Sequence, residues 1–599
     1  MRRLSIAFLF IMVLASIGYA QILHGSLTGN VRDQSGASIP GVRVVLLNSE
    51  TGQTRDTITN ENGAYGFATL LPGTYEITLT KEGFKVQKEQ RLNVAINTVT
   101  RADTALQVGA VGESVTIEAS AATLQTDRAE VRAEVTSREL LNVPVPPGRN
   151  YQGLFVTIPG FSPPRNNHSV PANPSRALQF NVNGTSSSSN NTRIDGASST
   201  NVWLPHMVAY VPALESIETV NVVTNSFDAE QGLAGGAAIN VQIKSGTNGL
   251  HGSGFEYHNS NATKAKPFFL PAGQKMPKLV YNQFGGTIGG PVIKNKLFYF
   301  ASYESSRDRQ YASSLASIPT PAMRNGDLSG APGVRPVFDP MTGDASNFGR
   351  QPFPNQQIPA SRFSPAAVRL AALFPTPTAD GTVNNYFTGN SYAFDRDTLD
   401  TKVNWNASEK LTMYGRLSLL DYRVANPGRL GNELGGDPVA GGQVGRATGN
   451  SYSTTFAATY VVKPSFIVDA YFGYTLMKGD SRQPRLEEKV GLDILKLPGT
   501  NGPRFFEGGM PQFQVAGFSN FGQPNNFMPY INRDPQFQYV ANANWSRGKH
   551  QIRFGTDFYQ QQLNQTQPEF VGAPWGASGG FNFNTVSYTH LTLPTNREV

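Results

Sequence analysis

Residues 282–304, NQFGGTIGGPVIKNKLFYFASYE, form the most informative segment of this chain. The polar triplet Lys294–Lys296 comes shortly after Pro291, and this combination is typical of a tight turn between two strands. Glycine pairs at 285–286 and 289–290 carry no side chains and therefore permit close strand packing or a bend. The segment predicts a long β-hairpin.

Apolar and polar residues alternate in several later segments. One face of segment 411–419 carries Leu411, Met413, Leu417 and Leu419, and the other carries Thr412, Tyr414, Arg416 and Ser418. Segments 466–476 and 550–559 repeat the pattern, and their polar faces hold Asp469, Arg553 and Asp557. Transmembrane β-strands are apolar toward lipid and polar toward the lumen in this way. A soluble β-sandwich could show the same alternation. The long loops, the aromatic content and an export signal at residues 1–20, described next, favour a membrane barrel.

The first residues, 1–20, have the pattern of an export signal. Arg2 and Arg3 precede an apolar run of about 14 residues, and small residues then lead to a predicted cleavage between Ala20 and Gln21. The alternative is a permanent anchor, but a membrane-spanning helix needs about 20 apolar residues. No later apolar run is long enough for such a helix either. We therefore expect the protein to leave the cytoplasm and to meet a membrane again only as a β-barrel.

The composition excludes several classes of function. Only 16% of the 599 residues are charged, against about a quarter in typical soluble domains, and 60 glycines with 40 prolines make the chain rich in turns. The chain has no cysteine, which excludes disulfide frameworks, thiolate metal sites and cysteine nucleophiles. Its seven histidines form no H-E-x-x-H motif and no H-x3-H pair, and no Lys/Arg run accompanies the net charge of +7. We therefore expect no enzyme, no cofactor, no metal site and no nucleic-acid partner.

Residues 24–108 predict a small β-sandwich. Turn signals separate short alternating segments about every ten residues, which is the usual spacing in sandwiches. The motifs I-P-G-V-x-V at 39–44, T-x-x-x-G-x-Y-x-F at 59–67 and L-P-G-x-Y at 71–75 occur in order. This part of the chain resembles the carboxypeptidase regulatory-like domain. The resemblance implies a non-catalytic module with a carbohydrate-binding-like fold, acting either as a periplasmic spacer or as a binding domain.

Residues 111–245 begin with a short β-branched segment beside flexible glycines. The segment consists of Glu113, Ser114, Val115, Thr116, Ile117, Glu118 and Ala119. Such a segment can add a strand to the edge of a partner's sheet. It resembles the TonB box of TonB-dependent outer-membrane receptors, which pairs with the energy-coupling protein. The alternative is that it forms the last strand of the sandwich, and the sequence does not separate the two.

The remainder of 111–245 resembles the plug domain of Oar-like TonB-dependent receptors. The motif that carries the resemblance consists of Asn183, Gly184, Asp195 and Gly196, with a Ser/Asn-rich segment in between. A β-rich segment at 212–248 continues the resemblance up to the first barrel strand, which begins near His251. Asp195 has no partnered base or nucleophile nearby in the sequence. We therefore expect it to form a turn with Gly196 and to have no catalytic role.

The hairpin at 282–304 also resembles a hairpin of Oar-like receptors, with the signature F-G-x-x-x-G-G-P-I-x-K-x-K-x-F-F-x-x-Y-E. The resemblance implies an all-β chain in which a small N-terminal sandwich and a plug precede residues 250–586, the first part of a 22-stranded transmembrane barrel. Alternating segments in that range give about ten strands. Residues 587–599 neither continue the pattern nor end on an aromatic residue. We expect a C-terminally truncated chain with a non-native tail.

The resemblance implies a receptor or transporter in the outer membrane of a Gram-negative bacterium, surrounded by outer-membrane lipid. An extracellular ligand would bind the long loops and the outer face of the plug, and a TonB-type energy-coupling protein would displace part of the plug. The alternative is a surface or adhesion protein with the same barrel and no active import. A carboxypeptidase-related enzyme is disfavoured because the zinc ligands are missing. The sandwich suggests a carbohydrate ligand, while peptides, siderophores and cobalamin stay open.

Overall fold

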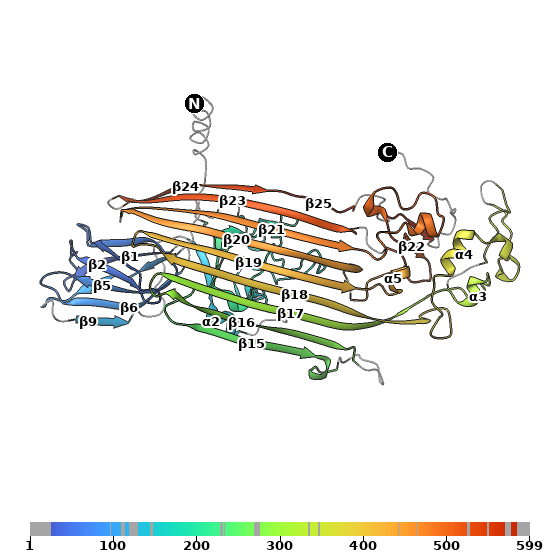
Figure 1. Cartoon of the computed structure of the whole chain (residues 1–599), viewed down its shortest axis with the longest axis horizontal. Coiled ribbons are helices and arrows are strands. Elements are labelled where there is room, and N and C mark those ends of the chain that lie inside the picture. The colour runs from blue at the N-terminus through green and yellow to red at the C-terminus, as the bar shows by residue number, and fades with distance from the viewer. Residues whose placement is uncertain are drawn as a thin grey trace, which may run out of the picture.

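The computed structural model describes residues 25–583 with some internal gaps. The gaps are 96–97, 110–113, 119–129, 144–147, 228–231, 233, 267, 269–275, 333–335, 345–347, 441, 464, 524–526, 548–549 and 569–576. Strands dominate and form three units, which are a small sandwich, a large curved wall and a mixed sheet with loops on the inner side of the wall, which we call the plug after the expected domain (Figure 1). The expected signal segment 1–20 with its cleavage site at Ala20 and Gln21, the box residues Glu113 and Ala119, and the expected tail 587–599 lie outside the described residues.

The N-terminal unit is a sandwich of two sheets. One sheet has the order β4-β1-β7, with β8 also paired to β1, and the other has the order β3-β2-β5-β6-β9. The strands are β1 (Gly25–Asp33), β2 (Arg43–Asn48), β3 (Thr54–Ile58), β4 (Ala64–Leu70), β5 (Gly73–Thr80), β6 (Val86–Val94), β7 (Val99–Arg101), β8 (Thr104–Leu106) and β9 (Ser114–Glu118). Because side chains alternate along a strand, every second residue faces the partner sheet, and these residues build a core around Leu27, Val44 and Ile77.

Strand β9 pairs with the sandwich and not with the plug sheet. It runs parallel to β6, with Val86 opposite Ser114 and Gln90 opposite Glu118. The free edge of β6 presents N–H and C=O groups that a following β-branched segment can satisfy. The sequence-based division groups these residues with the plug at 111–245. In the structure Ser114–Glu118 form the last strand of the sandwich, as the second interpretation expects, and the role of this strand as a TonB box stays a prediction.

The plug contains a mixed sheet of order β10-β13-β14-β11-β12. Its strands are β10 (Val131–Thr136), β11 (Asn191–Ile194), β12 (Ala197–Ser198), β13 (Ile217–Asn225) and β14 (Ala238–Ile243). Helix α2 (Ser137–Asn142) begins with a capping box between Thr136 and Glu139, and the 3-10 helices are η2 (Tyr151–Thr157), η3 (Ser187–Ser189) and η4 (Leu214–Ser216). Apolar residues such as Phe155, Val220 and Val241 form the plug core.

The wall is a ten-stranded sheet of order β15-β16-β17-β18-β19-β20-β21-β23-β24, with β25 also paired to β23. The strands are β15 (His251–Ser260), β16 (Leu279–Ile293), β17 (Leu297–Ala316), β18 (Tyr386–Asn406), β19 (Leu411–Asn426), β20 (Gly445–Lys463), β21 (Phe466–Arg482), β23 (Tyr530–Arg547), β24 (His550–Gln561) and β25 (Gln565–Thr566). Neighbouring strands are antiparallel, and the predicted hairpin turns at 294–296 between β16 and β17. The total of 22 strands stays a prediction.

The two ends of the wall differ in their connections. At the short-turn end, a few residues join β16 to β17, β18 to β19, and β20 to β21. At the long-loop end, the connections 317–385, 427–444 and 483–529 carry α3 (Pro321–Arg324), η7 (Pro354–Gln356), η8 (Ala360–Arg362), α4 (Pro365–Ala371), α5 (Gly431–Leu434), the π-helix η9 (Val490–Ile494), η10 (Phe505–Glu507) and β22 (Gln512–Val515), which pairs with β26 (Gly580–Phe583). In outer-membrane barrels short turns face the periplasm. The sandwich lies at that end (Figure 1).

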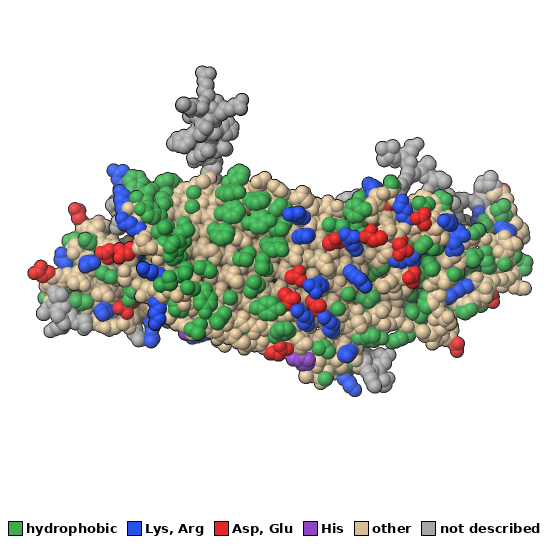
Figure 2. Space-filling model, viewed as in Figure 1, with side chains coloured by type: hydrophobic (Ala, Val, Ile, Leu, Met, Phe, Trp, Pro, Cys, Tyr) green, Lys and Arg blue, Asp and Glu red, His purple; other side chains and the backbone are tan. Residues whose placement is uncertain are grey.

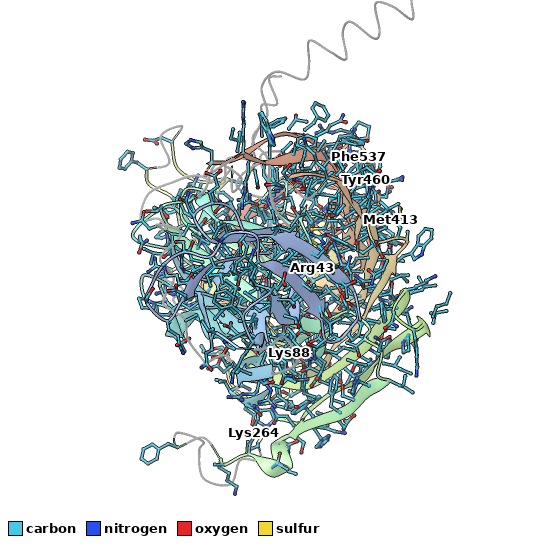
Figure 3. All side chains as sticks on the ribbon, turned by 90° about the vertical axis from the view of Figure 1, so that its left-hand side faces the viewer. Arg43, Lys88, Lys264, Met413, Tyr460 and Phe537 are labelled. Carbon is cyan, nitrogen blue, oxygen red and sulfur yellow. The ribbon has the colours of Figure 1, made fainter. Side chains whose placement is uncertain are left out.

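The wall separates polar from apolar side chains as the alternation predicts. On β19, Thr412, Arg416 and Ser418 are buried on the inner side, while Met413 and Leu417 are exposed on the outer side. Figure 3, viewed from the sandwich end, shows the wall curving, with Met413, Tyr460 and Phe537 along its outer side. In Figure 2 hydrophobic side chains gather on the outer face nearer the sandwich, and charged ones gather nearer the loops. A lipid-facing belt with a polar rim has this distribution.

No helix within the described part of the chain combines the length and the hydropathy that a membrane span requires.

Candidate functional site

The plug turn formed by Asp195 and Gly196 lies against the inner face of the wall. It joins β11 to β12 as a two-residue hairpin. Both residues have positive φ, 43° for Asp195 and 86° for Gly196, which a type I′ turn requires and an Asp-Gly pair adopts readily. Asn183 and Gly184 also have positive φ, 49° and 75°. The four residues of the expected plug motif therefore occupy two separate turns.

Two cationic side chains of the wall hold the Asp195 carboxylate. Nζ of Lys402 on β18 lies 3.0 Å from Oδ1, and Nε of Arg416 on β19 lies 3.5 Å from Oδ2. Lys402 also donates to the carbonyl of Ile243 at 3.0 Å, and the Tyr414 hydroxyl donates to the Asp195 carbonyl at 3.2 Å. The three charged side chains are at most 4% exposed. The contact ties the plug turn to two adjacent strands of the wall.

Further buried polar contacts join the plug to the wall. The Tyr210 hydroxyl donates to Asp400 at 2.7 Å, and Nη2 of Arg193 lies 3.4 Å from the Asp557 carboxylate. Backbone groups of the plug take part as well: Ser198 N–H donates to Gln538, the Thr475 hydroxyl donates to the Ser198 carbonyl, and Gln536 donates to the Thr200 carbonyl. We call these contacts, together with the Asp195 contact, the polar seam.

The interface has an apolar part beside the polar seam. The plug core is continuous with Tyr392, Phe394, Tyr422 and Val424 on the inner side of β18 and β19. These four residues lie in the half of each strand nearer the long-loop end. The plug is therefore seated by an apolar contact near the long loops and by ion pairs and hydrogen bonds elsewhere.

A buried ion pair fixes the relative position of its two partners but contributes little net free energy to stability. Taking each charge out of water costs several kcal/mol, and the attraction between the partners offsets that cost only while the geometry is good. When the two sides separate and water enters, each charge regains its hydration. The polar seam can therefore open at a small net cost, whereas an interface of the same area built from packed apolar side chains could not.

The sequence predicted one side of this site. The Asp-Gly pair predicts a turn at Asp195, and the alternation predicts Arg416, Asp469 and Asp557 on the inner face, where the structure has them. Lys402 and Asp400 were missed. Both lie at inward positions of β18, where buried and half-buried residues alternate. Charged residues at alternate positions of a barrel strand were the available signal.

The sandwich contacts the short-turn end of the wall. The Glu50 carbonyl accepts a hydrogen bond from Asn248 N–H at 2.9 Å, and the Gln53 side chain donates to Thr412 at 3.1 Å. A small cavity of about 50 Å³ lies between sandwich, plug and wall, and both Glu50 and Asp195 line it. The sandwich therefore covers the short-turn side of the plug next to the Asp195 turn.

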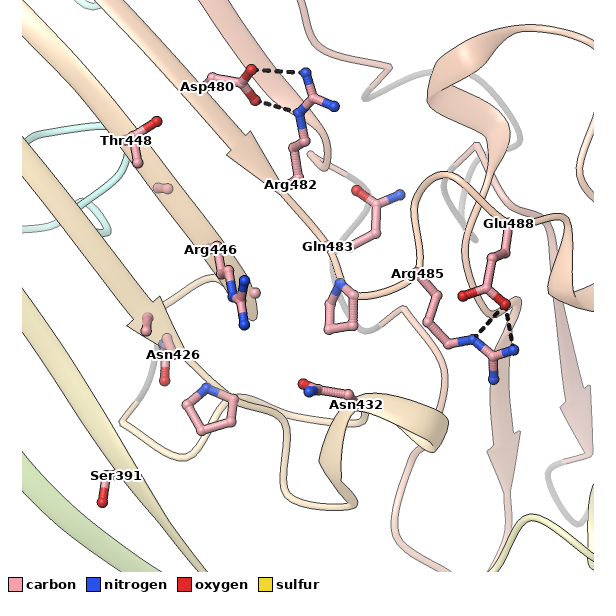
Figure 4. A pocket seen from close by; sticks show the side chains of 15 residues that line it. Ser391, Asn426, Asn432, Arg446, Thr448, Asp480, Arg482, Gln483, Arg485 and Glu488 are labelled. Atoms are coloured by element: carbon pink, nitrogen blue, oxygen red, sulfur yellow. Dashed lines mark hydrogen bonds and ion pairs between the residues drawn. The ribbon is translucent and has the colours of Figure 1, made fainter.

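A larger pocket, of about 610 Å³, lies at the long-loop end of β18–β21 (Figure 4). Within it Arg482 donates to Asp480 and Arg485 donates to Glu488. Arg446 also lines the pocket. Because inward residues of β20 and β21 alternate with outward ones, Arg446, Asp480 and Arg482 are on the outer side of the wall. The pocket is separate from the polar seam.

Comparison with known families agrees with this architecture. The family described as "Carboxypeptidase regulatory-like domain" matches residues 26–107. The family described as "Outer membrane beta barrel domain" matches residues 242–597, more than half of the 599-residue chain. The chain belongs to the outer membrane beta barrel family. This barrel protein is therefore an all-β protein of the Gram-negative outer membrane, as the sequence predicts.

The barrel protein is also similar to a curated transporter. It is 27% identical over 308 residues to the TonB-dependent transporter Oar of Myxococcus xanthus. The match covers 49% of this chain and 28% of the length of Oar. The resemblance to Oar-like receptors is thus confirmed, and the relative is a transporter and not an enzyme.

Solved structures of outer-membrane proteins show weaker similarity to the barrel protein. The outer membrane transporter YddB from Escherichia coli is 10% identical with a TM-score of 0.45, and the match covers 72% of this chain and 48% of YddB. The siderophore receptor PirA from Acinetobacter baumannii is 13% identical with a TM-score of 0.31, covering 73% of this chain and 58% of PirA.

Proposed function

We propose that this protein is a TonB-dependent receptor that binds an extracellular ligand and imports it to the periplasm by energised displacement of the plug. The observation that carries the proposal is the polar seam around Asp195, Lys402 and Arg416. Its ion pairs fix the plug against the wall while the interface is dry and separate at small net cost when water enters. A ligand of carbohydrate or peptide character fits the presence of the sandwich, and the relative named as a TonB-dependent transporter supports the energised step.

We further propose that strand β9 is the TonB box. Within the described residues it is an edge strand whose one strand neighbour is β6, to which it runs parallel. A partner strand from the energy-coupling protein could replace β6 as its neighbour through the same backbone groups. Of the described β9 side chains, Val115 is half-buried and Thr116 is exposed, so neither belongs to the sandwich core around Leu27, Val44 and Ile77.

The structured long loops favour a second candidate, a surface or adhesion protein without import. Residues from the connections 317–385, 427–444 and 483–529 share one apolar cluster. Its members include Ile318, Phe374, Leu434, Val490 and Phe521. A loop assembly with its own core presents a fixed outer surface, which suits adhesion as well as ligand capture.

A thiol probe in the plug distinguishes the two candidates without a known ligand. The chain has no cysteine, so Ser198→Cys introduces a single thiol, and Ser198 is 6% exposed in the seated plug. In living cells the receptor hypothesis predicts maleimide labelling that falls when an uncoupler collapses the proton gradient or when residues 113–119 are deleted. Ser329→Cys, on an exposed part of the long loops, should label equally in every condition. If neither the uncoupler nor the deletion of residues 113–119 changes labelling of the plug, the result would instead support the adhesion candidate.

A further inference from the structure

Two histidines from separate plug loops meet side by side. His168 and His206 are 38 residues apart in the sequence, yet their Nε2 atoms lie 2.7 Å from each other. The ring centroids are 5.0 Å apart and the ring planes differ by 27°, so the two rings meet end to end at their Nε2 atoms. In the neutral pair one ring donates its Nε2–H to the Nε2 lone pair of the other.

Buried asparagines hold both loops in place. Asn173 accepts a hydrogen bond from the Ala177 amide and donates to the Ala177 carbonyl, which closes the loop that follows His168. Asn201 accepts from the amides of Trp203 and Leu204, which closes the loop that precedes His206. Asn173 and Asn201 are each 3% exposed. Side-chain to backbone bonds of this kind fix loop geometry, so the two imidazoles are positioned before any ligand arrives.

The pair lies on the side of the plug that faces the long loops. Ser169, next to His168, lies so near Gly442 in the connection 427–444 that a Cβ added to this glycine would be 3.1 Å from the Cβ of Ser169. The carbonyl of Pro171 accepts a hydrogen bond from Tyr422, close to the long-loop end of β19. Both histidines are only half buried. A solute that enters between the long loops can therefore reach the two rings.

We propose that His168 and His206 form a binding site for a divalent transition metal of the Cu²⁺ or Zn²⁺ type. Two imidazole nitrogens on one tetrahedral metal, each about 2.0–2.1 Å from it, are about 3.3 Å apart. Chelation requires the Nε2 proton between the rings to move to Nδ1, and the rings to turn and separate by about 0.6 Å so that both Nε2 lone pairs meet at the metal. Imidazole is the protein ligand that suits these two metals, and Cu²⁺ binds such sites most tightly.

The surroundings leave the other coordination positions open. Within the described residues no group of three or more His, Cys, Asp or Glu side chains could hold a metal. In its neutral form each imidazole offers one ring nitrogen to a metal. The remaining positions would be filled by water or by donor atoms of an incoming molecule. The metal is thus exposed toward the long loops rather than enclosed in a structural site.

Metal titration of the purified whole protein in detergent tests the site. We expect one equivalent of Cu²⁺ to bind with an electron paramagnetic resonance spectrum that shows coupling to imidazole nitrogens, and Zn²⁺ to compete for it. His168→Gln with His206→Gln should weaken Cu²⁺ binding by at least 10-fold and remove the nitrogen coupling from the tight site. Each single variant should lose part of the affinity, which separates chelation by two rings from binding by either one.

His258→Gln is the matched control. His258 is exposed on β15 and contacts Asn282, remote from the pair. The His258→Gln variant should bind Cu²⁺ as the unchanged protein does. All variants should keep the heat-dependent gel migration of a folded barrel. Absence of stoichiometric binding to the unchanged protein, or binding that survives the double substitution in a folded protein, would overturn the proposal. Loss of binding in the control would also overturn it, because the metal would then sit elsewhere.

Discussion

Asp195 at the tip of a plug turn lies 3.0 Å from Nζ of Lys402 on the wall, although 207 residues separate them in the sequence. Both side chains are nearly fully buried, at 3% and 4% exposure. The contact joins a part that must move in the proposed transport cycle to a part that must stay in the membrane. The first prediction therefore concerns how strongly this ion pair holds the plug against the wall.

Lys402→Met should loosen the plug strongly. It leaves the Asp195 carboxylate with one cationic partner, Arg416 at 3.5 Å, and removing one member of a buried pair costs about 3–5 kcal/mol. We expect faster cleavage of the plug by protease in the folded protein. Arg423→Met is the control, because Arg423 lies 3.8 Å from Asp421 on the exposed outer side, where a pair contributes about 0–1 kcal/mol. Adding Asp195→Asn to Lys402→Met should restore part of the protection. Equal cleavage of the Lys402→Met and Arg423→Met variants would show that the pair does not hold the plug.

Gly473→Val should push the plug hairpin off the wall. A Cβ atom at Gly473 would lie 3.0 Å from the Cβ of Ala197, directly after the Asp195 turn. Overpacking of this kind costs about 1–3 kcal/mol. Hydrogen–deuterium exchange in residues 191–198 should accelerate. Gly254→Val on β15 has open space around the new side chain and should leave exchange unchanged. Slow exchange in both variants would mean that the hairpin does not need this close approach.

A disulfide between β6 and β9 should block import if β9 is the TonB box. Lys88 and Thr116 are opposite each other in the parallel pair, and neighbouring strands bring Cα atoms within the 4.4–6.8 Å that a disulfide spans. The lock Lys88→Cys with Thr116→Cys should abolish the gradient-dependent exposure of the plug. Because the lock itself consists of thiols, the plug here carries a biotin acceptor as its reporter instead of a cysteine. A reducing agent should restore the exposure. The matched lock Arg43→Cys with Ile58→Cys joins β2 to β3 and leaves β9 free, so displacement should continue. Displacement that persists with β9 locked would exclude the exchange.

Glu89→Gln should stabilise the sandwich at neutral pH. Burial raises the pKa of the Glu89 carboxyl, and the hydrogen bond from Thr104 at 2.6 Å opposes this only in part. The folded sandwich binds the Glu89 proton more tightly than the unfolded chain does, so protonation of Glu89 stabilises the fold. This contribution is full below the ordinary glutamate pKa and is lost as the pH rises through the raised pKa. Pulse proteolysis in urea should therefore show a gain for the variant at pH 7 that disappears near pH 4. Glu82→Gln, at an exposed position, should show no gain at either pH. A gain for Glu89→Gln that is independent of pH would point to packing instead of ionisation.

Much of the fold follows from local pattern, and particular residues show why. Arg416, Asp469 and Asp557 could be assigned to the inner face because side chains alternate strictly along a strand. The turn at Lys294–Lys296 and the Asp195–Gly196 turn follow from residue types that tolerate those backbone angles. The partner of β9 could not be predicted in this way, since an edge strand can satisfy its hydrogen bonds with any free neighbour.

The sequence by itself determined an all-β barrel protein, its two classes of wall side chain and its plug turns, because each of these depends on residues within a few positions of one another. Only the tertiary structure decided that Lys402 meets Asp195, that β9 closes the sandwich and that His168 meets His206. These contacts join residues between 28 and 207 positions apart. Strand register and the seating of the plug set them, and both are fixed by the packing of the whole molecule and not by local preference.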